Sequence, residues 1–215
     1  MGDLQHLREI YTTALVSDAL DTMGWRNQVL GYDIAPMSGT AVLVGRAFPV
    51  QLQKVEQIPD LPYVGLLAAL DAVGADDVFV LPTARATDVG FWGELLSTSC
   101  QARGVAGALT DGPVRDLARV RELGFTVFGR GTISADINGR YEVVDHRVEA
   151  QIDNVTIHPG DLVVGDIDGV VIIPNELIEQ VTAIVKEKNR GESAFRTAVR
   201  AGVAPSVAFA EYGVL

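Results

Sequence analysis

The chain has 215 residues, 48% of them apolar, and a formal net charge of −11. This length and apolar content predict a globular protein with its own core and exclude a disordered chain. An acidic chain with only three lysines lacks the basic surface that binds nucleic acid or anionic membranes, so we expect neither partner. A basic protein partner is compatible with this charge.

The single cysteine and the polar N-terminal residues indicate the cellular compartment. Cys100 lies in an apolar helical pattern, and one cysteine forms neither an intramolecular disulfide nor a thiolate metal cluster. We expect it to be buried as a small hydrophobe. The polar start does not resemble a signal peptide, and no apolar run reaches about 18 residues. These features predict a soluble cytoplasmic protein without a membrane span.

The first two thirds of the chain alternate between helical and strand patterns, separated by Gly and Pro. Strand, helix, strand, helix, strand at the observed spacing is a βαβ pattern and predicts parallel strands. The expected elements are a helix over 3–13, a helix over 18–23 capped by Ser17 and ended by Gly24, an irregular segment 25–37, strands 39–45 and 47–55, a helix 61–73, a strand 77–81, a helix 93–103, a strand 105–109, a helix 114–123 and a strand 125–128.

The last third changes in character. Residues 141–174 are short apolar runs broken by turn residues and predict antiparallel strands; residues 175–188 and 192–200 predict helices, followed by an apolar tail. No linker or repeat divides the chain. We therefore expect a single α/β domain over residues 1–215, with residues 175–215 a helical C-terminal extension. The extension has too little core to fold alone, so we expect it to pack on the body or on a neighbouring subunit.

Charged residues follow two of the predicted parallel strands. Arg115 and Asp116 come after the strand 105–109, and Glu94 opens the helix that follows the strand 77–81. A guanidinium binds a carboxylate bidentately, an aspartate can hold a divalent metal, and a helix start offers free N–H groups to an anion. Ends of parallel strands meet at one sheet edge, so these residues should converge. Alternatively, Glu94 complements its helix dipole, and Arg115 and Asp116 form an ordinary surface pair.

Several segments resemble the RraA-like family: residues 93–96, 102–107 and 111–116, with further similarity over 16–21, 160–166 and 168–174. That family includes class II aldolases for 4-hydroxy-4-methyl-2-oxoglutarate and 4-carboxy-4-hydroxy-2-oxoadipate. It also includes a regulator of an RNA-degrading endonuclease, and this regulator lacks the metal-binding aspartate. The resemblance implies a swivelling β/β/α fold that assembles as a homotrimer or homohexamer.

The resemblance also implies roles for individual residues. Asp116 matches the direct ligand of Mg²⁺ or Mn²⁺, and Glu94 matches the residue that holds metal-bound water. Glu192 matches, more loosely, an acid that reaches the metal through water from a neighbouring subunit. Arg115 matches the arginine that binds the pyruvyl group, whose carboxylate the family binds on the turn formed by Gly93, Glu94, Leu95 and Leu96.

One position departs from the family pattern. The family usually has a second carboxylate three residues after the metal aspartate, and this chain has Arg119 there. A cation at this place could weaken metal binding by repulsion, or bind a second carboxylate of a larger substrate.

These features predict a metal-dependent aldolase that cleaves a 2-oxo acid through a pyruvate enolate, with oxaloacetate decarboxylation as a side activity. One alternative is a non-enzymatic regulator that binds a basic partner protein. Another is an enzyme of the same type for an unrelated oxo acid. A pure binding protein has no need of Glu94, Arg115 and Asp116 together, so their presence favours an enzyme.

Overall fold

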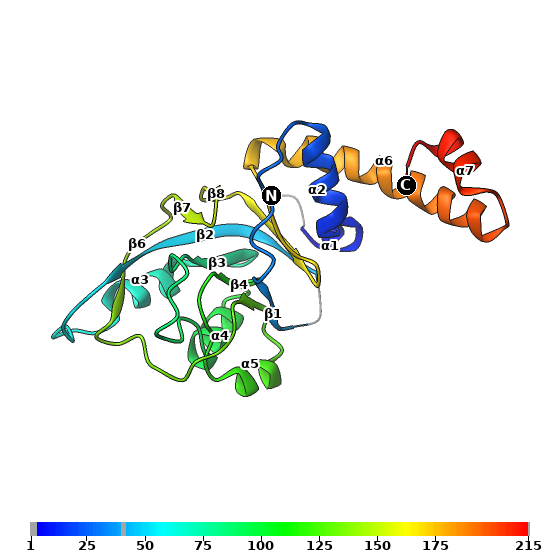
Figure 1. Ribbon diagram of the computed structural model, residues 1–215. Coiled ribbons are helices and arrows are strands. Elements are labelled where there is room, and N and C mark those ends of the chain that lie inside the picture. Colours follow the sequence, from blue (N-terminus) through cyan, green and yellow to red (C-terminus); the bar gives the residue numbers. More distant parts are fainter. Residues whose placement is uncertain (1–3, 40–41, 215) are drawn as a thin grey trace.

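The computed structural model describes residues 4–39 and 42–214, in which a curled, mixed eight-stranded sheet forms the centre (Figure 1). A separate two-stranded hairpin accompanies the sheet. The sheet strands are β1 Ala35–Ser38, β2 Leu43–Lys54, β3 Asp77–Leu81, β4 Gly107–Thr110, β5 Val127–Gly129, β6 Tyr141–His146, β9 Leu162–Asp166 and β10 Gly169–Ile173; the hairpin strands are β7 Ala150–Ile152 and β8 Val155–Ile157.

The strand order is β1-β5-β4-β3-β2-β9-β10, with β6 paired to the second half of β2. The strands from β2 to β5 are parallel. Strands β1, β6 and β9 join this set antiparallel, and β10 pairs antiparallel with β9. The predicted parallel pairing and the predicted antiparallel strands over 141–174 are therefore confirmed. Parallel strands require both faces to be covered, which explains the continuous apolar runs of β3 and β4.

Alternate residues of one strand face two different cores. Phe79 and Leu81 of β3 contact the layer formed by the helices α3 Val64–Ala72, α4 Glu94–Ala102 and α5 Leu117–Leu123. Val78 and Val80 face the opposite side, which the β7–β8 hairpin covers with Ile152 and Ile157. A third core lies where α1 Gln5–Ile10, α2 Thr13–Thr22 and α6 Ile178–Arg200 pack on β9 and β10.

The C-terminal extension begins with a short 3₁₀ turn, Asn175–Leu177, and continues as α6. Val181 and Val185 of α6 are buried against α1 and α2. The helix then leaves the body, and α7 Pro205–Tyr212 returns along its far end (Figure 1). Among the described residues, no helix combines the length and apolar character needed to cross a membrane.

Two helix starts differ from prediction. The second helix begins at Thr13, because Thr12 has extended backbone and its hydroxyl accepts the N–H of Leu15 at 3.2 Å; Ser17 lies inside the helix and is not its cap. The helix predicted from residue 114 begins only at Leu117. Asp116 precedes it in the left-handed region at φ 54°, which interrupts the helical path. The helix end near Gly24 is confirmed.

Two predicted breaks are absent: the predicted strands 39–45 and 47–55 join in one strand, and the predicted helices 175–188 and 192–200 join in one helix. Gly45 is within the single long strand β2, where a side chain would come within 2.7 Å of the Asp76 carbonyl oxygen. Gly191 is within the single helix α6, where Val214 packs 3.2 Å from its would-be Cβ. Both glycines therefore permit close packing and do not mark turns. Residue 3 of the first predicted helix and residues 40–41 of the first predicted strand lie outside the described residues.

The C-terminal prediction also needs a correction at its end. Residues predicted as an apolar tail form α7, which starts with Pro205 at its first position, where a missing N–H costs nothing. The segment predicted as irregular, 25–37, ends in β1, because Ala35–Ser38 pairs with β5 at the sheet edge. Cys100 is fully buried as predicted, and burial raises the pKa of its thiol to about 12.

Gly65 of α3 tests how closely this helix packs on the sheet. A Cβ atom there would lie 1.8 Å from the carbonyl oxygen of Val143 in β6. Gly65→Ala should therefore lower the free energy of unfolding by about 1–3 kcal/mol, although alanine normally favours a helix. Urea unfolding measures this, with Ala68→Ser on the exposed side of α3 as the control. An alanine variant as stable as the unchanged protein would contradict the packing.

Candidate functional site

The loops that follow β3, β4 and β5 continue to pair beyond the ends of the strands. The N–H of Phe91 donates to the Pro113 carbonyl at 2.8 Å, and the N–H of Arg115 donates to the Trp92 carbonyl at 2.7 Å. On the other side, Val114 forms a parallel bridge with Thr132. Three loops that are distant in sequence therefore lie side by side and carry their polar side chains to one place.

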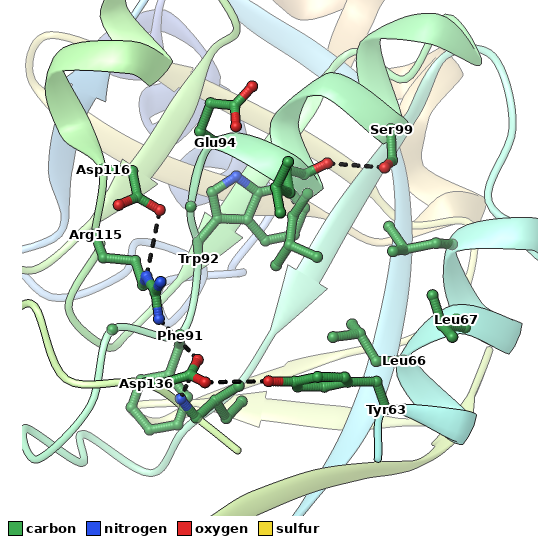
Figure 2. Close-up of a pocket in the computed structure, with 16 residues that line it drawn as sticks. Tyr63, Leu66, Leu67, Phe91, Trp92, Glu94, Ser99, Arg115, Asp116 and Asp136 are labelled. Carbon is green, nitrogen blue, oxygen red and sulfur yellow. Dashed lines mark hydrogen bonds and ion pairs between the residues drawn. The ribbon is translucent and has the colours of Figure 1, made fainter. Parts of the chain in front are cut away.

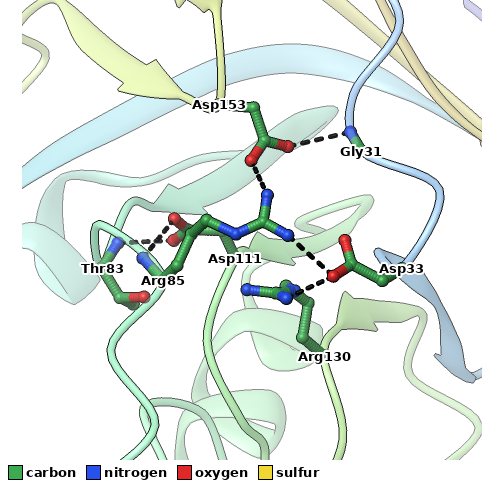
Figure 3. A network of polar contacts seen from close by, with 7 residues as sticks. All are labelled: Gly31, Asp33, Thr83, Arg85, Asp111, Arg130 and Asp153. Atoms are coloured by element: carbon green, nitrogen blue, oxygen red, sulfur yellow. Dashed lines mark hydrogen bonds and ion pairs between the residues drawn. The ribbon is translucent and has the colours of Figure 1, made fainter.

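A buried carboxylate holds two of these loops together (Figure 3). Asp111, directly after β4, is 1% exposed and accepts the backbone N–H of Thr83 at 2.5 Å and of Arg85 at 2.8 Å. Ala84 and Arg85 have left-handed backbone, φ 52° and 61°. Asp111 thus stabilises a tight turn whose geometry is costly for residues with a side chain.

The same turn is tied to the edge of the molecule through an ion-pair network (Figure 3). The guanidinium of Arg85 bonds Asp153 and Asp33, and that of Arg130 bonds Asp33. Burial alone would raise the pKa of Asp33, but its bonds to Arg130 and Arg85 outweigh burial and lower the pKa. Asp153 also accepts the N–H of Gly31 at 2.8 Å, so four segments of the chain meet here.

Glycines let the next pair of side chains approach the loop. Arg115 Nε bonds Asp116 Oδ2 at 3.3 Å. A side chain on Gly93 would lie 2.9 Å from that oxygen, and one on Gly90 would lie 2.8 Å from Arg115 Cβ. Asp116 has φ 54°, a conformation in which aspartate and asparagine are enriched. The backbone conformation at Asp116 is therefore unfavourable, and Gly90 and Gly93 leave the room that the side chains of Arg115 and Asp116 occupy.

Arg115 and Asp116 line a pocket of about 320 Å³ together with Gly93, Glu94, Leu95 and Leu96 (Figure 2). The predicted convergence of these residues is thus observed. No side chain caps the start of α4, so the N–H groups of its first turn have no helical partner. The pocket therefore combines an arginine, two carboxylates and a helix N-terminus.

A third carboxylate was missed by the sequence analysis. Asp136 follows β5, the last of the parallel strands, and accepts from Arg115 Nη1 at 2.7 Å, from the Tyr63 hydroxyl at 3.1 Å and from the Ile137 N–H at 2.9 Å. Its position after a strand of the same parallel set was the available signal. Tyr63 precedes α3 with left-handed backbone, and nothing in the sequence places it opposite Asp136.

A divalent metal fits the donors of this pocket. Mg²⁺ usually binds one or two protein carboxylates and keeps several waters. Asp116, which is exposed, and Glu94, which is half-buried and accepts the Thr98 hydroxyl at 2.9 Å, provide two carboxylates beside the space that Gly93 leaves free. The described residues contain no cluster of three or more His, Cys, Asp or Glu arranged to hold a metal. Any metal here would therefore take most of its ligands from water and substrate.

Two residues that the sequence analysis singled out for the site, Arg119 and Glu192, do not line the pocket. Arg119 lies on α5 and pairs with Glu122 at 2.9 Å, with both side chains largely exposed. Glu192 lies on the outer part of α6 and pairs with Arg196, also at 2.9 Å. Within one chain, neither side chain is part of the pocket wall.

Known proteins share the sequence pattern and the fold of this chain. The family model described as "RraA-like: Aldolase/RraA" matches residues 13–172. The chain belongs to the RraA-like family. The predicted RraA-like α/β fold with a helical C-terminal extension is confirmed.

Two curated relatives differ in how much of their length the chain spans. One is a Halalkalibacterium halodurans protein named "Putative 4-hydroxy-4-methyl-2-oxoglutarate aldolase", 30% identical over 97% of this chain and 93% of the relative. The other is Protein DlpA of Legionella pneumophila, 27% identical over 88% of this chain. The chain spans only 30% of the length of DlpA.

Similar solved structures support the assignment to this family. An uncharacterized Pseudomonas syringae protein is 30% identical with a TM-score of 0.82, and 93% of each chain is covered. RraAS2 of Streptomyces coelicolor, described as an unusual member of the RNase ES inhibitor RraA family, is 28% identical with a TM-score of 0.72, over 91% of each chain. The family thus includes relatives named for an aldolase and for an inhibitor.

The contact between Tyr63 and Asp136 predicts a measurable titration. Burial raises the pKa of the Tyr63 phenol, and the bond to Asp136 raises the pKa further because a carboxylate opposes the phenolate charge. Asp136→Asn should therefore lower the pKa of Tyr63. NMR titration of ¹³C-labelled tyrosine, assigned with Tyr63→Phe, measures this shift.

The chain contains a matched control. Tyr141 donates to Asp88 at 2.9 Å, and burial and that carboxylate likewise raise its pKa. Asp88→Asn should lower the pKa of Tyr141 and leave Tyr63 unchanged. If Tyr63 titrates identically with and without Asp136, the observed contact is not formed in solution.

Proposed function

We propose that this protein is a divalent-metal-dependent aldolase that cleaves a 4-hydroxy-2-oxo acid to pyruvate, and that it also decarboxylates oxaloacetate. The observation that carries this proposal is the convergence of Glu94, Arg115 and Asp116 on one pocket in a member of the RraA-like family. The pocket walls carry three carboxylates against one guanidinium. An anionic substrate needs further positive charge there, and Mg²⁺ or Mn²⁺ held by Asp116 would provide it.

Each pocket group has a role in binding the oxo acid. The N–H groups at the start of α4 bind the substrate carboxylate. The bound metal would polarise the 2-keto oxygen as a Lewis acid. Arg115 donates to the same oxygen and stabilises the negative charge that develops as the enolate forms. Asp136 and Asp116 bond two different nitrogens of Arg115 and so fix the plane of the guanidinium.

The cleavage step requires a base and one bond scission. A water held by Glu94 accepts the proton of the 4-hydroxyl. The electron pair of the C3–C4 bond moves into the pyruvate unit, the former C4 becomes a carbonyl, and the enolate carbon is then protonated. In oxaloacetate the bond to the departing CO₂ breaks instead, and the same enolate results.

Pyruvate release from 4-hydroxy-4-methyl-2-oxoglutarate and from oxaloacetate, with Mg²⁺ and again with EDTA, tests the proposal. Metal-dependent release from both substrates is expected. A second candidate is a non-enzymatic regulator of a basic protein, supported by the similarity to RraAS2 and by the net charge of −11. No release from either substrate by folded protein supplied with metal would favour that regulator.

Substitutions at the charged pair should remove the activity. Asp116→Asn keeps a residue suited to the left-handed backbone but loses the charge, and Arg115→Lys loses the bidentate fork. Each should lower kcat/KM by about 10²–10³. Arg119→Gln is the control, since Arg119 lies outside the pocket. Near-normal kinetics of Asp116→Asn would refute the assignment of the metal ligand.

We also propose that the chain assembles as a homotrimer or homohexamer in which Glu192 reaches the metal-bound water of a neighbouring subunit. This would explain why the outer part of α6 carries Glu192 far from the pocket of its own chain. Mixing Asp116→Asn with Glu192→Gln subunits should restore activity, because some sites then combine two intact halves. Unchanged activity of Glu192→Gln alone would exclude this role.

A further inference from the structure

The pocket has two chemically different sides (Figure 2). One side carries the charged groups Glu94, Arg115, Asp116 and Asp136. The other side is formed mainly by leucines of α3 and of the first turn of α4: Leu66, Leu67, Leu70, Leu95 and Leu96. The hydroxyl groups of Tyr63 and Ser99 also lie here, but they donate to Asp136 and to the Leu95 carbonyl. A substrate bound at Arg115 must therefore extend its remaining atoms along an apolar wall.

The leucines form both the floor and the rim of this wall. Leu66 and Leu70 are buried, and they belong to the main core. Leu67 and Leu95 are 56% and 75% exposed, respectively, and border the opening. An alkyl group placed among them loses contact with water and gains contact with four side chains, which is favourable.

A second carboxylate in this position would have no cation of the same chain to pair with. Arg115 is the sole cation among the lining residues of the described chain, and it already faces Asp116 and Asp136. Arg119, which could have bound a second carboxylate, pairs with Glu122 outside the pocket. A carboxylate beside the leucines would lose hydration without an ion pair and would be repelled by the three pocket acids.

We propose that the pocket accepts dicarboxylates but prefers 4-hydroxy-2-oxo acids that have one carboxylate and an alkyl or aryl group on C4, a specificity that rests on the proposed aldolase function. Leu67 is the residue that determines this preference at the rim. Cleavage breaks the C3–C4 bond, the C4 hydroxyl proton goes to the base, and the products are pyruvate and an apolar aldehyde. The reaction is redox-neutral and needs no further reactant.

Two substrates that differ only at the C4 substituent test the preference. 4-Hydroxy-2-oxoheptanoate carries a propyl group and gives pyruvate and butanal, whereas 4-hydroxy-2-oxoglutarate carries a carboxylate and gives pyruvate and glyoxylate. Pyruvate is quantified by chromatography with Mg²⁺ present. We expect kcat/KM to be about tenfold or more higher for the propyl substrate, as is usual when an apolar pocket discriminates.

A cation introduced at the rim should reverse this preference. Leu67→Arg places a guanidinium beside the substituent and should raise kcat/KM for the dicarboxylate while lowering it for the propyl substrate. Val64→Arg is the matched control. Val64 lies one turn earlier on α3 and is 60% exposed, but it does not line the pocket. It should leave the ratio of the two kcat/KM values unchanged.

The outcomes separate the two proposals. Equal or better cleavage of the dicarboxylate by the unchanged protein overturns the substrate class and leaves the aldolase function intact. A ratio that responds equally to Leu67→Arg and Val64→Arg overturns the role of Leu67. Absence of pyruvate from both substrates and from 4-hydroxy-4-methyl-2-oxoglutarate overturns the aldolase function itself.

Discussion

The site depends on the lateral pairing of three loops that follow neighbouring parallel strands. Asp116 and Asp136 are exposed and Arg115 is half-buried, so none of these side chains is fixed by burial in the core. Their positions come from backbone bonds between the loops, such as the one from the Arg115 N–H to the Trp92 carbonyl. Trp92 is buried among Phe79 and Phe125, so the loop that receives this bond is anchored in the main core. Core packing thus fixes the geometry of exposed charges.

Buried polar groups complete this support from the other side of the loops. Asp111 has almost no exposed surface, and its two backbone donors explain how a carboxylate is tolerated there. The turn that it holds carries Arg85 into the network with Asp33 and Asp153. The same loop then runs on to Gly90 and Gly93, so the ion-pair network and the pocket share one segment of chain. Strained backbone at Asp116 is accepted within this rigid frame.

The excess of acids in the pocket also shapes its chemistry. Three carboxylates would repel an oxo acid, yet the family to which the chain belongs includes a relative named for an oxo acid aldolase. In the function that we propose, a divalent cation removes this repulsion, because it compensates the negative charge of the pocket carboxylates and also polarises the substrate. The leucines on the opposite side add a second constraint on the substrate, since apolar substituents bind favourably beside them and further charged groups do not.

The sequence by itself determined the parallel βαβ order, the antiparallel strands after residue 141 and the meeting of Glu94 with Arg115 and Asp116. These follow from local patterns, because strand ends of a parallel set share one edge whatever the details of packing. Tertiary structure alone decided the roles of Gly45 and Gly191, which lie at or beside predicted breaks between elements but allow close approach of neighbouring segments. It also placed Tyr63 against Asp136 and turned the leucines of α3 towards the pocket. Such contacts join residues about 70 positions apart, so they depend on how helices pack on the sheet, which local sequence does not encode.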